Sequence, residues 1–139
     1  MPDGPYVSGY GNYTNPDEYT DDVTTYFDVS WAWAAGAMIS NVYDVKKWVE
    51  LLIDGGMISD TLQQQRFVGK TIGNGTVTYG LGIYKYTGID MWGHNGGLPG
   101  YTSVMMRDKT NDRTIVIFYN VQGSPAPEPL FMSIEKLLR

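Results

Sequence analysis

The chain has 139 residues, a net charge of −5 and no cysteine. The length suits one domain with one core, and 42% hydrophobic and 14% aromatic residues favour a globular fold over disorder. The acidic balance argues against a nucleic-acid partner, because phosphates require a basic surface. The lack of cysteine excludes disulfides, thiolate nucleophiles and Cys-ligated metals. We expect neither a metal nor a cofactor.

No stretch reaches the roughly 20 apolar residues of a membrane helix. The start Met1-Pro2-Asp3-Gly4 also lacks the basic and apolar regions of a signal peptide. We therefore expect no membrane segment in this chain and leave its compartment unknown.

Residues 1–29 are rich in Tyr, Asp, Gly and Pro and show no helical or alternating pattern. They predict an irregular arm or loop, and residues 30–139 predict an α+β domain. The small apolar run from Ser30 to Met38 suits tight burial. We place the four tryptophans (Trp31, Trp33, Trp48 and Trp92) in the core, with a pocket wall as the alternative for Trp92.

Three helices are predicted. The first follows Asn41, repeats apolar residues at spacings of three and four, and ends at Gly55-Gly56. A shorter one opens at Ser59 and runs to Phe67, and the last spans 130–138.

From Thr76 onward the pattern becomes that of strands, with turn residues between them. The predicted strands cover 76–86, 90–94, 102–107 and 113–121. The fold class is therefore α+β, with an antiparallel sheet of three to four strands flanked by helices.

The segment from Gly93 to Tyr101 holds the only histidine, His94, among glycines that permit close backbone approach. From the residues alone, His94 is either a structural turn residue or part of a site. This segment is also one of four, in order along the chain, that carry a family resemblance: Ala35-Gly36-Ala37-Met38-Ile39-Ser40, Tyr79-Gly80-Leu81-Gly82-Ile83, Gly93-His94-Asn95-Gly96-Gly97-Leu98-Pro99-Gly100-Tyr101 and Val116-Ile117-Phe118-Tyr119-Asn120.

With these segments the chain resembles the C-terminal part of the serine hydrolases that include class C β-lactamases, D-alanyl-D-alanine carboxypeptidases and penicillin-binding-protein-like esterases. The resemblance implies an incomplete β-lactamase/transpeptidase-like fold. It implies that His94 helps to organise proton transfer and contacts substrate, and that the Gly97 N–H lies in the oxyanion hole. It also implies that Asn95, Gly96 and Trp92 line the substrate site.

Two further motifs of that family have no good match here. Ser133-Ile134-Glu135-Lys136 fits Ser-x-x-Lys only as a string, because it lies in the last predicted helix instead of far upstream of the histidine. Tyr10-Gly11-Asn12 and Tyr13-Thr14-Asn15 fit Tyr-x-Asn, and we interpret both as chance matches. Lys70-Thr71-Ile72 approximates a Lys-Thr-Gly motif, but it lacks the glycine and lies outside the predicted strands.

We interpret the chain as a C-terminal fragment of a penicillin-recognising serine hydrolase that is inactive alone. The full-length protein would act on a peptide, a β-lactam or an ester, and family members are commonly exported. One alternative is a binding or assembly module that completes its sheet through an open edge, either by forming a homodimer or by pairing with a missing half. Another is a binding domain that has kept the pocket and lost the chemistry.

Overall fold

The computed structural model describes residues 6–123 and 126–139, so the expectation about Met1–Gly4 lies outside the described residues. The chain divides into two compact units. One comprises Val42–His94 and Met105–Val116, and the other Met1–Asn41, Asn95–Val104 and Ile117–Arg139. The expected division near residue 29 stays a prediction.

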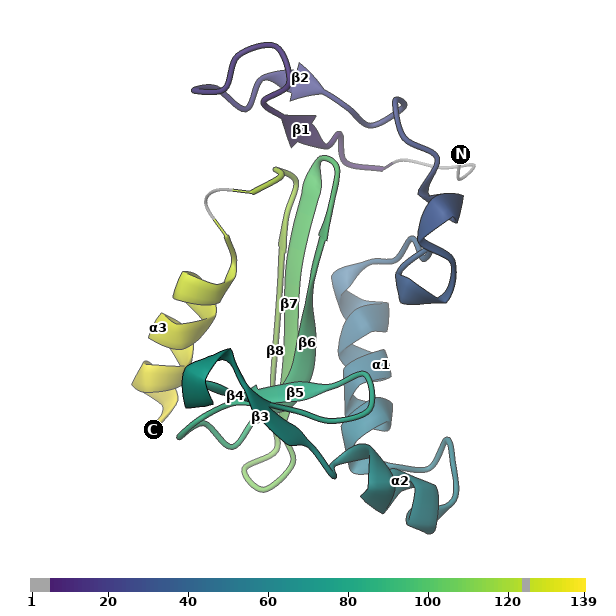
Figure 1. Ribbon diagram of the computed structural model, residues 1–139, viewed down its shortest axis with the longest axis vertical. Helices are drawn as coiled ribbons and strands as arrows, with labels where there is room; N and C mark the ends of the chain where they lie inside the picture. The colour runs from purple at the N-terminus through teal and green to yellow at the C-terminus, as the bar shows by residue number, and fades with distance from the viewer. Residues whose placement is uncertain (1–5, 124–125) are drawn as a thin grey trace. The chain divides into compact units, whose positions relative to one another are not determined.

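Two helices open the first of these units, and both were predicted. α1 (Val42–Asp54) ends at Gly55 and Gly56, whose φ angles of 101° and 104° stop a right-handed helix. α2 (Asp60–Arg66) is capped by the Ser59 side chain, which accepts a hydrogen bond from the Leu62 N–H at 3.5 Å. Figure 1 shows α2 following α1.

The main sheet has six strands in the order β3-β4-β5-β6-β7-β8, so the expected count of three to four is wrong although the α+β class is confirmed. The strands are β3 (Lys70–Ile72), β4 (Val77–Tyr79), β5 (Tyr84–Tyr86), β6 (Trp92–Leu98), β7 (Tyr101–Asp108) and β8 (Arg113–Tyr119). Figure 1 shows the last three side by side.

One extra strand arises because a tight turn divides a predicted strand, and the other is β3, which lies before that strand in the chain. The predicted strand over 76–86 is two strands, because the Gly80 N–H bonds the Ile83 carbonyl at 2.8 Å and reverses the chain. Gly82 has a φ of 68° in this turn, and a side chain on Gly80 would meet the Arg66 carbonyl oxygen at 2.2 Å. Lys70–Ile72, placed outside the sheet from sequence, pairs with β4 as β3.

α1 packs its apolar face on this part of the sheet. Val49, Leu52, Ile53 and Ile83 form a buried cluster. Partly buried side chains surround it: Phe67, Trp92, Met105 and Val116. The spacing of apolar positions in α1 predicted the burial of Val49, Leu52 and Ile53 correctly, whereas Val42, at the start of the same series, is exposed.

A polar network joins the end of α1 to β7 and β8. The buried Arg107 guanidinium donates to both carboxylate oxygens of Asp54, at 3.1 and 2.6 Å. It also pairs with Asp112 at 2.9 Å, and the Lys109 ammonium donates to the Asp54 carbonyl at 2.9 Å. The two carboxylates raise the pKa of Arg107 above its usual range. This network holds the last turn of α1 in place.

The turn between β7 and β8 is organised by the buried carboxylate of Asp108. Burial would raise the pKa of Asp108, but hydrogen bonds from the Asn111 side chain (2.7 Å) and backbone (3.0 Å) contribute to holding it below 3.8. A carboxyl group with a lowered pKa in the folded state stabilises the fold above its unfolded pKa. That stabilisation disappears as pH falls through the folded value.

We expect Asp108→Asn to lower the free energy of unfolding by about 1 kcal/mol at pH 7, because the charge-assisted hydrogen bonds are weakened. The difference from wild type should shrink as pH falls below about 4, where the carboxyl group becomes protonated. Urea unfolding at pH 7 and pH 3 measures both values. A gap that stays constant between the two pH values would contradict the assignment.

The other unit contains the N-terminal residues and the last helix. β1 (Tyr10–Gly11) pairs antiparallel with β2 (Asp21–Asp22), and Tyr10 bonds the backbone of Asn120 and Gln122. A 3₁₀ segment, η1, spans Val29–Ala35, and α3 spans Glu128–Leu138.

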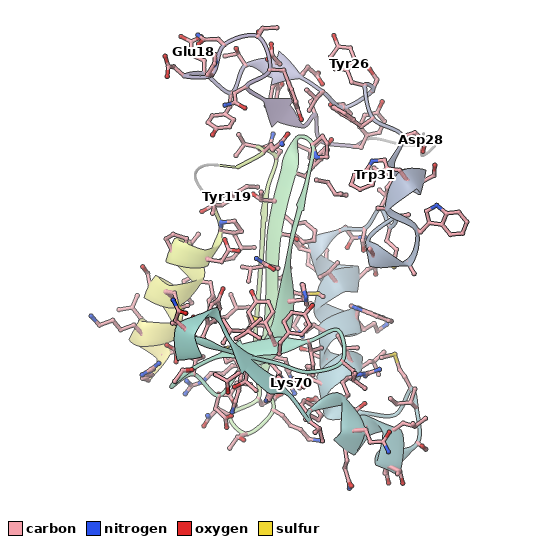
Figure 2. The ribbon with its side chains drawn as sticks, in the orientation of Figure 1. Glu18, Tyr26, Asp28, Trp31, Lys70 and Tyr119 are labelled. Carbon is pink, nitrogen blue, oxygen red and sulfur yellow. The ribbon has the colours of Figure 1, made fainter. Side chains whose placement is uncertain are left out.

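The expected burial around Ser30–Met38 is wrong for the described chain. Trp31 and Trp33 are 59% and 83% exposed, and Trp48 is also exposed. Figure 2 labels Trp31 in this segment and Tyr26 shortly before it. Apolar composition predicts that a segment avoids water, but it does not say which surface covers it.

None of the helices in the described ranges is both long and apolar enough to cross a bilayer.

Candidate functional site

The predicted site residues lie on β6, where successive side chains point to opposite faces of the sheet. Trp92, His94 and Gly96 thus share one face, and Asn95 and Gly97 the other. Gly93 lies so close to β7 that a Cβ there would be 1.9 Å from the Met105 carbonyl oxygen. The backbones of β6 and β7 therefore approach each other closely at the start of the motif.

Two tyrosines from the preceding strands hold the imidazole of His94. The Tyr79 hydroxyl lies 2.6 Å from His94 Nε2, and the two rings meet edge to face with centroids 5.6 Å apart. The Tyr84 ring meets the imidazole at 5.1 Å and stacks on Tyr79 at 6.1 Å. The Tyr84 hydroxyl lies 3.2 Å from that of Tyr86. The imidazole thus packs against two aromatic rings, and the Tyr79 hydroxyl is among its polar partners.

Asn95 faces a different partner. Its side-chain N–H donates to Glu128 Oε1 at 2.6 Å, in the first turn of α3. A carboxylate near a helix N-terminus is favourably placed in the field of the helix dipole. The contact makes Asn95 a link between β6 and α3, a role that the sequence did not suggest.

Gly96 and Gly97 leave two consecutive positions of β6 without side chains. Both are exposed, and a Cβ on Gly97 would meet nothing within 4 Å. The recorded pairing of β5 with β6 is the single pair Tyr84–Gly93, which lies before this stretch.

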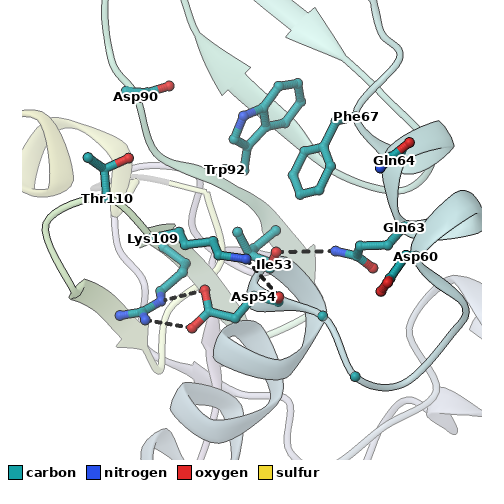
Figure 3. A pocket seen from close by; sticks show the side chains of 13 residues that line it. Ile53, Asp54, Asp60, Gln63, Gln64, Phe67, Asp90, Trp92, Lys109 and Thr110 are labelled. Atoms are coloured by element: carbon teal, nitrogen blue, oxygen red, sulfur yellow. Dashed lines mark hydrogen bonds and ion pairs between the residues drawn. The ribbon is translucent and has the colours of Figure 1, made fainter.

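Trp92 lines a pocket of about 460 Å³, and its contact with substrate stays a prediction. Its ring meets Phe67 edge to face at 5.3 Å, and Lys85 Nζ lies 5.3 Å from the ring centroid. In Figure 3, the Asp54 carboxylate bonds Arg107, and Gln63 bonds the end of α1. The polar groups of this pocket largely bind one another.

The Ser133 hydroxyl donates to the Pro129 carbonyl at 2.9 Å, one turn back in α3. In the Tyr-x-Asn strings, Asn12 bonds the Pro16 carbonyl and Tyr13 bonds Gln122. The Ser133 and Asn12 contacts are local, and the Tyr13 contact joins residues 109 positions apart. Within residues 6–123 and 126–139, no group of three His, Cys, Asp or Glu side chains could hold a metal ion.

The comparison with protein families decides the family. The sequence model of the Beta-lactamase family matches residues 2–136. The chain belongs to the Beta-lactamase family.

Individual members and solved structures support this assignment. Over 108 residues the chain is 29% identical to PbpX of Bacillus subtilis (strain 168), whose name describes a penicillin-binding protein. A D-stereospecific amidohydrolase from Streptomyces sp. matches with a TM-score of 0.82 and 24% identity. D-amino acid amidase from Ochrobactrum anthropi SV3, complexed with D-phenylalanine, matches with a TM-score of 0.71 and 25% identity.

These matches cover most of this chain but a minor part of its relatives. The matched region is 77% of this chain and 26% of PbpX. For the two solved structures, 96% and 95% of this chain corresponds to 40% and 43% of theirs. The chain therefore corresponds to a minority of the length of each of these relatives.

Sequence reasoning missed two partners of the motif in this Beta-lactamase family member. Tyr79 belongs to one of the four resembling segments, but nothing in the sequence indicated that its hydroxyl reaches His94. Glu128 lies 33 positions from Asn95 and offered no signal other than its place in the first turn of the last helix.

Proposed function

We propose that this chain supplies the histidine-bearing wall of an acyl-transfer site in a serine hydrolase of the Beta-lactamase family. The observation that carries the proposal is the position of His94: its imidazole is fixed by Tyr79 at the start of a strand whose edge then runs on through glycines. An amide or β-lactam carbonyl laid along that edge would reach backbone N–H donors.

In the proposed reaction, a serine hydroxyl attacks the acyl carbonyl and the bond to the leaving amine or alcohol breaks. The Gly97 N–H would donate to the developing oxyanion, and His94 would assist proton transfer or bind the substrate carboxylate. Asn95, Gly96 and Trp92 keep their proposed roles at the substrate site. We assign the nucleophile to a part of the protein outside this chain, since the Ser133 hydroxyl is engaged within α3.

The names of the relatives support an amide or β-lactam as the proposed substrate class. Amidohydrolase, amidase and penicillin-binding proteins all act on or bind amide-containing compounds, so we favour an amide or β-lactam over an ester. The choice between a carboxypeptidase, a β-lactamase and an amidase depends on residues outside the proposed wall.

Intact-protein mass spectrometry after incubation with a reactive β-lactam tests this proposal. We expect no covalent adduct on this chain alone. A longer chain that includes an upstream Ser-x-x-Lys should be acylated, and His94→Ala should slow acylation by roughly 100-fold or more. Ser133→Ala in the same longer chain is the matched control and should react like wild type. An adduct on this chain that Ser133→Ala abolishes would overturn the proposal.

The alternative of a homodimer through a sheet edge has less support. β3 is the outermost strand on its side of the sheet, and all three of its residues are exposed. It is short and carries Lys70, two features with which proteins prevent edge pairing. We therefore do not propose a dimer.

A further inference from the structure

We propose that Tyr79 is a positioning residue that fixes the orientation and the tautomer of His94. The inference deepens the function proposed above, and its consequence for catalysis rests on that function. The contact itself does not, because it can be measured on His94 directly.

The first step is geometric. A distance of 2.6 Å between the Tyr79 hydroxyl oxygen and His94 Nε2 is a short hydrogen bond. The Tyr79 ring stands almost perpendicular to the imidazole, at 87°, and the Tyr84 ring meets it at 71°. Contacts from both tyrosines restrict rotation of the imidazole about its side-chain bonds.

The second step is to decide which atom donates the proton. A separation of 2.6 Å is short for an N–H donor and ordinary for an O–H donor, and a neutral imidazole nitrogen without hydrogen is a good acceptor. If Tyr79 donates to Nε2, the neutral ring must carry its proton on Nδ1. A histidine side chain in water favours the opposite tautomer, with the proton on Nε2. The Tyr79 contact therefore selects a form that the free side chain disfavours.

The third step concerns what the imidazole can then offer. With Nε2 engaged by the Tyr79 hydroxyl, the N–H of the neutral ring is at Nδ1. A donor suits the binding of a substrate carboxylate or carbonyl oxygen, which is one of the roles proposed for His94. Tyr79 thus acts through His94 and need not touch the substrate.

The chain offers an unusually clean test because His94 is its only histidine. Nitrogen-15 NMR of histidine-labelled protein at pH 8 reports which ring nitrogen carries the proton. We expect wild type to show a protonated Nδ1 and a non-protonated Nε2. In Tyr79→Phe, which keeps the ring and removes the hydroxyl, the Nε2–H form should become the major tautomer.

Tyr84→Phe is the matched control. It also removes one hydroxyl from a ring that touches His94, and that hydroxyl lies 3.2 Å from the Tyr86 hydroxyl. Its tautomer should equal that of wild type. Backbone amide spectra of all three proteins establish that each is folded.

Three outcomes would overturn the proposal. They are a wild-type ring with its proton on Nε2, an unchanged tautomer in Tyr79→Phe, or an equal change in Tyr84→Phe. The first needs no variant, so a failure of Tyr79→Phe to fold would not block the test.

Acylation of the longer chain separates this inference from the proposed function. Loss of the hydrogen bond in Tyr79→Phe should lower the acylation rate by roughly tenfold. A changed tautomer with an unchanged rate would confirm the positioning and contradict the catalytic role proposed for His94.

Discussion

Gly93→Ala is expected to lower the free energy of unfolding by about 3 kcal/mol, one of the two largest effects that we predict for a single substitution. The added Cβ would lie 1.9 Å from the Met105 carbonyl oxygen and 2.8 Å from its carbon. Both atoms belong to the backbone of β7, so no side-chain rotation can relieve the clash. Either the strands must separate or the local hydrogen bonding must distort.

Gly97→Ala provides the control on the same strand. A Cβ there would meet nothing within 4 Å, and Gly97 is not among the residues with positive φ. Its unfolding free energy should stay within about 0.5 kcal/mol of wild type. Urea unfolding followed by circular dichroism measures both variants. Equal losses for Gly93→Ala and Gly97→Ala would contradict the close approach of β6 and β7.

Asp54→Asn should lower the unfolding free energy by about 2 to 3 kcal/mol, because it removes the charge that compensates a buried guanidinium. The Arg107 side chain is only 7% exposed and donates to both Asp54 oxygens. An amide at position 54 offers one acceptor oxygen and no charge.

Asp112→Asn is the matched comparison, since Asp112 pairs with the same guanidinium at 2.9 Å but is 91% exposed. Its loss should be below about 0.5 kcal/mol, because water screens exposed ion pairs. Asparagine also tolerates the positive φ of 54° at that position. Chemical denaturation of both variants provides the test. A larger loss for Asp112→Asn would mean that burial does not set the strength of these pairs.

The helices were predictable from the sequence because their signals are local. The apolar spacing in α1, the paired glycines after it and the Ser59 cap of α2 each depend on a few neighbouring residues. The strands were predicted less well. A run of β-branched and aromatic residues over 76–86 does not reveal that Gly80 and Gly82 fold it back on itself.

The candidate site was also predictable only in part from the sequence. The glycines and His94 could be recognised as a motif from their order along the chain. The partners of the motif could not, since Tyr79 reaches His94 from two strands away in the sheet and Glu128 reaches Asn95 from 33 residues away. Long-range side-chain contacts depend on register, which a single sequence does not give.

The end of α1 also has a consequence for the order of folding. Its last turn is bonded by Arg107 and Lys109, which lie 53 and 55 residues later in the chain. Glu50, one turn earlier, accepts a hydrogen bond from Thr114, 64 residues later. Contacts between residues so far apart require large loops to close, and proteins dominated by such contacts fold slowly. We therefore expect the C-terminal turn of this helix to be completed only when the hairpin of β7 and β8 has docked.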